Sequence, residues 1–156
     1  MNYDKLTTKA REAVLEAHGT AQRDGAPELY AEYILLAILQ QKGGVVPALL
    51  RKAGRTPEPF IANTREALGR KPRVKGLNGG LHESASASRL LLGAVDIAGQ
   101  MGDEYSSTEH LFLSALEQPE TKKLIQKEGI DTARALDALR SVRGNTKVTS
   151  TDPEGQ

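Results

Sequence analysis

The chain has no cysteine and almost no net charge among its 156 residues. Without cysteine, a disulfide framework, a thiolate zinc site and a cysteine nucleophile are all excluded. Lysine and arginine number 21 against 20 aspartate and glutamate residues, so no chain-wide field attracts nucleic acid or anionic lipid. Neither class of polyanion is therefore an expected partner.

Long apolar runs and nucleotide motifs are also missing. The opening stretch, MNYDKLTTKAREAV, has no apolar signal core, and no run approaches the roughly 18 apolar residues of a membrane span. No G-x-x-x-x-G-K-[ST] phosphate loop is present, and the histidines at 18, 82 and 110 lack metal-ligand spacing. We expect a cytoplasmic chain that is not itself an enzyme and holds no cofactor or metal.

What is present is helical periodicity. Apolar residues recur at three- and four-residue steps from Ala10 to Ala21, on a helix that Thr7 or Thr8 would cap. Glycines and Pro57 stand where further helices would end or begin, and no strand-length alternation of apolar and polar residues occurs. The pattern predicts an all-α fold of eight helices, the other seven near residues 30–41, 45–53, 57–69, 84–101, 107–117, 120–128 and 131–142.

The helical pattern occurs twice. A shift of 77 places residues 10–39 on residues 87–116 with 8 identities in 30 positions, where unrelated sequence would give about 2. Farther along, LLRKAG at 49–54 meets LIQKEG at 124–129. Two copies are too few for a solenoid. We therefore expect two pseudo-symmetric four-helix repeats in one globule, with the apolar helices YAEYILLAIL and STEHLFLSAL buried at its centre.

Two stretches interrupt this pattern. Residues 70–83 are rich in glycine and positive charge, and are predicted to connect repeat one, about 6–69, to repeat two, about 84–143. Residues 144–156 are polar and free of aromatic residues, and are predicted to form a flexible tail. The predicted folded domain is thus residues 1–143.

The repeats carry a family resemblance. The motifs GD-Y-STEHL-L-AL, L--K-GI and AL---R resemble the double Clp-N motif, the N-terminal domain of Clp-family AAA+ unfoldases. RGNTKVTSTDPEGQ, at 143–156, is similar to the segment that precedes the first ATPase module in ClpB-type disaggregases. ClpC- and ClpA-type chains lack this phrase. One departure is Ala31-Glu32-Tyr33, where the family usually has Pro-Glu-His.

The resemblance implies a domain that engages unfolded or aggregated client proteins and passes them to an ATP-driven ring. ATP and magnesium would then belong to ATPase modules absent from this chain. It implies a monomeric isolated domain, a hexameric full-length protein, and a co-chaperone or adaptor as a further partner. The alternative is an adaptor-docking domain of a ClpC- or ClpA-type unfoldase. A nucleic-acid module built on the basic residues of 51–55 and 70–75 is disfavoured, because no aromatic residue stands among them.

Candidate site residues fall into two groups. Thr7, Asp103 and Glu109 match polar family positions associated with clients, although each has a local alternative: a helix cap for Thr7, a turn for Asp103, and a Ser106-x-x-Glu109 capping box.

The second group is a row of apolar residues in addition to the stripe that we expect to be buried. Leu90, Gly93 and Ile97 lie one turn apart, beside a buried stripe that includes Leu91 and Met101. They predict an apolar client-binding groove, with Tyr105 as a wall and His110 beside it. The alternative is that the rest of the fold covers this row.

Overall fold

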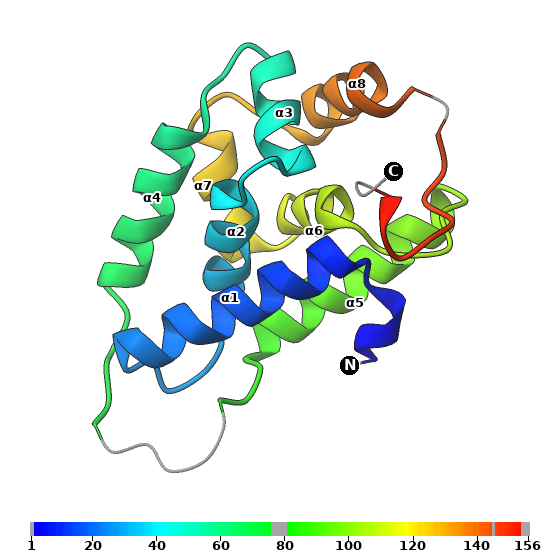
Figure 1. Ribbon diagram of the computed structural model, residues 1–156. Helices are drawn as coiled ribbons and strands as arrows, with labels where there is room; N and C mark the ends of the chain where they lie inside the picture. Colours follow the sequence, from blue (N-terminus) through cyan, green and yellow to red (C-terminus); the bar gives the residue numbers. More distant parts are fainter. Residues whose placement is uncertain (1, 76–80, 145, 154–156) are drawn as a thin grey trace.

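The computed structural model describes residues 2–75, 81–144 and 146–153, and Figure 1 shows their arrangement. A 3-10 turn at Tyr3–Lys5 precedes eight α-helices in these ranges, so the all-α prediction is confirmed. The helices are α1 (Thr8–Asp24), α2 (Ala31–Gln40), α3 (Val45–Lys52), α4 (Pro57–Gly69), α5 (Ala85–Gln100), α6 (Thr108–Ala115), α7 (Pro119–Gln126) and α8 (Thr132–Arg143).

The helix boundaries repeat with the spacing of the sequence. Helices α1 and α5 begin 77 residues apart, and α4 and α8 begin 75 residues apart. Their caps repeat too: the Thr7 hydroxyl accepts the Ala10 amide at 3.2 Å, and the Ser84 hydroxyl accepts the Ala87 amide at 3.1 Å. The predicted Thr7 cap is therefore confirmed, and each repeat begins with the same local structure.

The two repeats are joined by reciprocal backbone pairing. Leu6 forms a parallel bridge with Ser106, and Leu29 forms one with Glu83. Under the 77-residue shift these two bridges exchange places. The residue before the first helix of each repeat thus pairs with the residue that leads to the second helix of the other repeat.

Two apolar helices occupy the centre, as predicted. In α2 every residue from Ala31 to Leu39 is buried, and in α6 all eight residues are buried. Helices α2 and α6 pack on each other, α3 packs on α8, and α4 packs on α7 (Figure 1). No single helix of the described ranges is long and apolar enough to cross a membrane; α2 and α3 meet that test only as a pair bent by 76°.

The connection between the repeats is anchored on both sides of residues 76–80, which lie outside the described residues. The Val74 amide donates to the Gly25 carbonyl at 2.8 Å, and the Leu29 amide donates to the His82 carbonyl at 2.9 Å. The Lys71 Nζ lies 3.0 Å from the buried Glu32 carboxylate. The described parts of the connection therefore belong to the packed structure.

Helix α5 packs against α6 at Gly93. A Cβ at this position would lie 2.5 Å from the Ser114 Oγ, which itself donates to the Leu90 carbonyl at 2.7 Å. A side chain on residue 93 would therefore push the two helices apart. Gly99, on the same helix, has no neighbour within 4 Å of such a Cβ.

We expect Gly93→Ala to destabilise the protein by about 1–2 kcal/mol, because overpacking outweighs the gain in helix propensity. The matched change Gly99→Ala should stabilise it by about 0.5–1 kcal/mol. Urea unfolding of both variants measures the difference. Adding Ser114→Ala to Gly93→Ala should restore most of the loss, and additive effects of the two changes would contradict the contact.

Candidate functional site

Residues 146–151, here named the C-terminal strap, pack on the second repeat. The Val148 side chain is only 5% exposed, and its carbonyl accepts the Glu104 amide at 2.8 Å. The Thr151 carbonyl accepts the Thr8 amide at 2.6 Å, which ties the strap to the start of α1. Figure 1 shows the strap running from the end of α8 past the end of α5 and back toward α1.

Residues 146–151, which the sequence assigned to a flexible tail from residue 144, pack on the folded domain in this structure. Composition suggested a solvated segment, but one buried valine and paired backbone groups hold this polar stretch in place. Residues 145 and 154–156, also assigned to that tail, lie outside the described residues.

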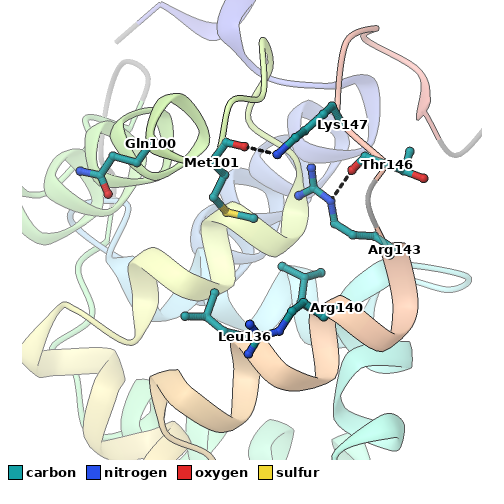
Figure 2. A pocket seen from close by; sticks show the side chains of 9 residues that line it. Gln100, Met101, Leu136, Arg140, Arg143, Thr146 and Lys147 are labelled. Carbon is teal, nitrogen blue, oxygen red and sulfur yellow. Dashed lines mark hydrogen bonds between the residues drawn. The ribbon is translucent and has the colours of Figure 1, made fainter.

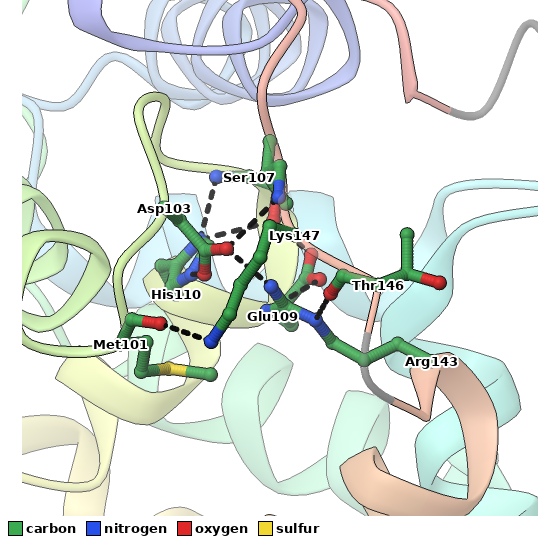
Figure 3. A network of polar contacts seen from close by, with 9 residues as sticks. Met101, Asp103, Ser107, Glu109, His110, Arg143, Thr146 and Lys147 are labelled. Atoms are coloured by element: carbon green, nitrogen blue, oxygen red, sulfur yellow. Dashed lines mark hydrogen bonds and ion pairs between the residues drawn. The ribbon is translucent and has the colours of Figure 1, made fainter.

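Asp103 is the acceptor that joins the strap to the helices (Figure 3). Its Oδ1 accepts the Val148 amide at 2.8 Å and a hydrogen bond from the Arg143 guanidinium at the end of α8. Its Oδ2 lies 2.7 Å from the His110 Nε2 in the first turn of α6. One buried carboxylate thus binds α6, α8 and the strap.

His110 occupies the N3 position of α6 and caps the helix. The Ser107 amide donates to the His110 Nδ1 at 2.8 Å, so that nitrogen is an acceptor and the Nε2 donates to Asp103. The predicted capping box of Ser106 and Glu109 is wrong by one residue: the cap is Ser107, and its box partner is His110.

Glu109 is buried and has internal partners. The Ser107 hydroxyl donates to its carboxylate, and the Arg143 Nη1 lies 3.6 Å from its Oε2. Arg143 therefore pairs with two buried acids, Asp103 and Glu109, and is itself only 12% exposed. We name Asp103, Ser107, Glu109, His110 and Arg143 the Asp103 network.

The network shifts two pKa values downward. Burial opposes ionisation of Asp103, but hydrogen bonds from Arg143, the Val148 amide and His110 together hold the pKa of this carboxyl below its usual value. Burial lowers the pKa of His110, although Glu109 and Asp103 oppose the shift. Neutral His110 agrees with an Nδ1 that accepts the Ser107 amide, because a proton there would break that bond.

A groove with a volume of about 630 Å³ lies beside this network, between the end of α5 and α8 (Figure 2). Leu139 is its buried apolar residue, while Met101 is half-buried and Leu136 is 37% exposed. The strap forms one edge. We name this cavity the α8 groove; its lining residues are Gln100, Met101, Leu136, Leu139, Arg140, Arg143, Gly144, Thr146 and Lys147.

The structure corrects the predicted groove along α5. Leu90 is fully buried and Gly93 faces Ser114, because α6 covers this part of the row. His110 is also fully buried, so it cannot line an exposed surface. Ile97 and Tyr105 remain half-buried.

The open cavity instead lies at the C-terminal end of the same helix. Met101 follows Ile97 by one helical turn and lines the α8 groove, although the periodicity placed Met101 in the buried stripe. The partly exposed end of the predicted row thus leads toward the α8 groove.

The structure also brings together the polar residues that were predicted separately. Asp103 lies in the loop between α5 and α6, and Glu109 lies in the first turn of α6. Thr7 contacts the same loop, because its amide donates to the Ser106 carbonyl at 3.0 Å. All three side chains are buried. Contact between a client and Asp103 or Glu109 would require the Asp103 network to open.

Sequence reasoning missed Arg143, Val148 and Leu136. Arg143 was assigned to the domain end and Val148 to the tail, because charge and composition carry no signal for a contact between residues 40 or more positions apart. The conspicuous signal was Val148 itself, an apolar residue in a polar segment. Leu136 stands on the exposed side of α8 and belongs to no buried stripe.

Four of the basic residues considered for nucleic acid, Arg55, Arg70, Lys71 and Arg73, have partners within the fold. Arg70 pairs with Glu66 and Arg73 with Asp24, and the Arg55 Nε donates to the Glu128 carbonyl. In the described part of the chain, no group of three or more His, Asp or Glu side chains is arranged to hold a metal ion.

Comparisons with known proteins agree on one family. The family model described as the Clp repeat (R) N-terminal domain matches residues 5–128. The chaperone protein ClpB of Nitratidesulfovibrio vulgaris is 35% identical over 160 residues, which cover 99% of this chain and 18% of that protein. The chain thus spans about a fifth of the length of this relative.

Solved structures show the same fold. The Hsp104 N-terminal domain from Candida albicans matches with a TM-score of 0.84 and 20% identity, covering 94% of this chain and 97% of that chain. A ClpV N-domain solved in complex with a VipB peptide matches with a TM-score of 0.62 and 18% identity, covering 92% and 91%.

The neutral state of His110 predicts that the free energy of unfolding depends on pH. Below about pH 6.5, the ordinary pKa of histidine, His110 is protonated in the unfolded chain but stays neutral in the folded chain. The free energy of unfolding therefore falls as the pH falls. The slope from this residue is at most about 1.4 kcal/mol per pH unit. Urea unfolding between pH 7.5 and 5 should show this slope reduced in His110→Gln and unchanged in His82→Gln, which alters an exposed residue. Equal slopes in all three proteins would refute a buried neutral His110.

The burial of Val148 predicts that the substitution Val148→Asp detaches the strap locally. A carboxylate cannot remain in the buried site without a large desolvation cost, so the strap should detach while the helices stay folded. Amide exchange at Glu104 and Thr8, whose N–H groups donate to the strap, should accelerate at least about tenfold. Thr149→Asp, at the adjacent exposed position, should leave both amides protected.

Proposed function

Because the chain belongs to the Clp repeat (R) N-terminal domain family, we propose that it is the client-engaging N-terminal domain of a ClpB-type ATP-dependent chaperone. It binds exposed apolar segments of unfolded or aggregated proteins and passes them to an ATPase ring. The family match confirms the predicted resemblance to the double Clp-N motif. The ATPase modules, with their ATP and magnesium, belong to the part of ClpB that this chain does not span.

The α8 groove is the observation that carries this proposal. Its volume of about 630 Å³ lies within the range of ligand clefts, roughly 300–1,000 Å³. Met101 and Leu136 present apolar atoms at its surface. Exposed apolar side chains distinguish an unfolded chain from a folded one, so such a surface can select non-native proteins.

Binding in this groove should be weak and tolerant of sequence. A flexible client loses conformational entropy when it docks, and the groove holds only a few side chains. Weak binding suits a domain that must release each segment to the ring. The Asp103 network contributes to the proposed function because it holds α8 and the strap on the two sides of the groove.

Docking of a folded adaptor is the rival function. A related ClpV N-domain was solved with a VipB peptide, and that domain shares the fold of this chain. An adaptor would present its contact surface while folded, whereas a client would present it only when unfolded. The two functions therefore differ in one measurable property, the folding state of the ligand.

We expect an unfolded test protein to shift the NMR resonances of residues around Met101 and Leu136, and the same protein when folded to shift none. Leu136→Asp should weaken binding of the unfolded protein about tenfold or more, because it puts a charge on the apolar surface. Leu15→Asp is the matched control, since Leu15 is 70% exposed on α1, outside the groove. Equal losses in both variants, or shifts caused only by a folded partner, would contradict client binding in the α8 groove.

A further inference from the structure

The charged residues that line the α8 groove all have the same sign. Arg140 lies on α8, Arg143 is the last residue of that helix, and Lys147 belongs to the strap. No acidic side chain lines the groove among the residues that the structure describes. The groove is therefore apolar inside and cationic along its rim.

These cations differ in whether buried acidic side chains already neutralise their charge. Arg143 is neutralised by Asp103 and Glu109 in the buried network. Arg140 has a side chain that is 74% exposed, and its ion pair with Asp137, at 3.8 Å, is also exposed. Exposed pairs of this kind contribute about 0–1 kcal/mol, so Arg140 is free to change partner.

Lys147 is the second available cation. Its Nζ donates to the Met101 carbonyl at 2.6 Å, just beyond the end of α5, where the helix dipole is negative. That contact offsets only part of the charge, and the ion pairs of the described residues include none for Lys147. Figure 2 shows Lys147 beside Met101 and Arg140 beside Leu136.

The equivalent place in the first repeat has different chemistry. Met101 corresponds to Asp24 under the 77-residue shift, and Asp24 accepts a hydrogen bond from Tyr33 at 2.9 Å and pairs with Arg73. An acid bonded to its own neighbours thus replaces the half-buried methionine. The combination of apolar surface and available cations belongs to the second repeat.

From this charge complementarity we infer that the α8 groove selects client segments in which a carboxylate lies next to a large apolar side chain. The apolar group packs on Met101 and Leu136, and the carboxylate pairs with Arg140 or Lys147. This inference rests on the proposed function and adds a substrate preference to it. The carboxylate restricts the segments that bind, whereas apolar contact alone would accept any of them.

Two peptides test the preference: an unstructured segment with alternating leucine and aspartate, and the same segment with asparagine for aspartate. Fluorescence anisotropy gives their affinities for the intact chain. The aspartate peptide should bind about threefold to tenfold more tightly, as two partly exposed ion pairs allow. Its advantage should shrink as salt rises from about 50 to about 300 mM, because salt screens exposed charges.

The variant Arg140→Gln/Lys147→Gln should abolish this difference without weakening the asparagine peptide. This variant also removes the contact of Lys147 with the Met101 carbonyl, so exchange of the Glu104 amide checks that the strap stays docked. Arg134→Gln/Lys122→Gln is the control: it removes the same charge from exposed residues outside the groove.

Equal binding of both peptides to the unchanged protein would overturn the preference and leave client binding intact. A preference that survives in Arg140→Gln/Lys147→Gln, or is lost equally in the control, would also overturn it. If neither peptide bound and an unfolded protein also shifted nothing in the groove, the proposed function itself would fail.

Discussion

The mutual burial of α2 and α6 is the constraint on which the rest of the structure depends. Neither helix has a polar face, so neither repeat can fold with its central helix in water. Each repeat supplies cover for the other, through the packing of α3 on α8 and α4 on α7 and through the reciprocal bridges of Leu6 and Leu29. The two repeats thus share one hydrophobic core, although the sequence is a duplication.

The duplication leaves an acid in the first turn of each central helix. Glu32 and Glu109 are both buried, and each pairs with a cation from the chain that follows: Lys71 in the connection, Arg143 at the end of α8. A buried carboxylate without such a partner would be costly. The segment after α4 and the end of α8 are therefore held against the central helices by the same kind of ion pair.

The proposed function is associated with the positions at which the repeats have diverged. In the second repeat, Asp103 and His110 extend the pairing of Glu109 into a network that also holds the strap. The equivalent residues of the first repeat are Ala26 and Tyr33, and Tyr33 donates to Asp24 instead. The strap and α8 leave between them a cavity that presents apolar surface to solvent. Stability thus comes from the symmetric elements, whereas the proposed client binding comes from the asymmetric ones.

The sequence by itself determined the helices, their order, the duplication and the family. These properties depend on local periodicity, on caps such as Thr7 and on residue spacing, all of which are written along the chain. Only the tertiary structure decided that α6 covers Leu90, that Ser107 rather than Ser106 caps α6, and that Val148 holds the strap. Whether an apolar row is open or covered depends on which distant helix packs against it. A contact such as Arg143 with Asp103 arises from residues 40 positions apart, which the fold alone brings together.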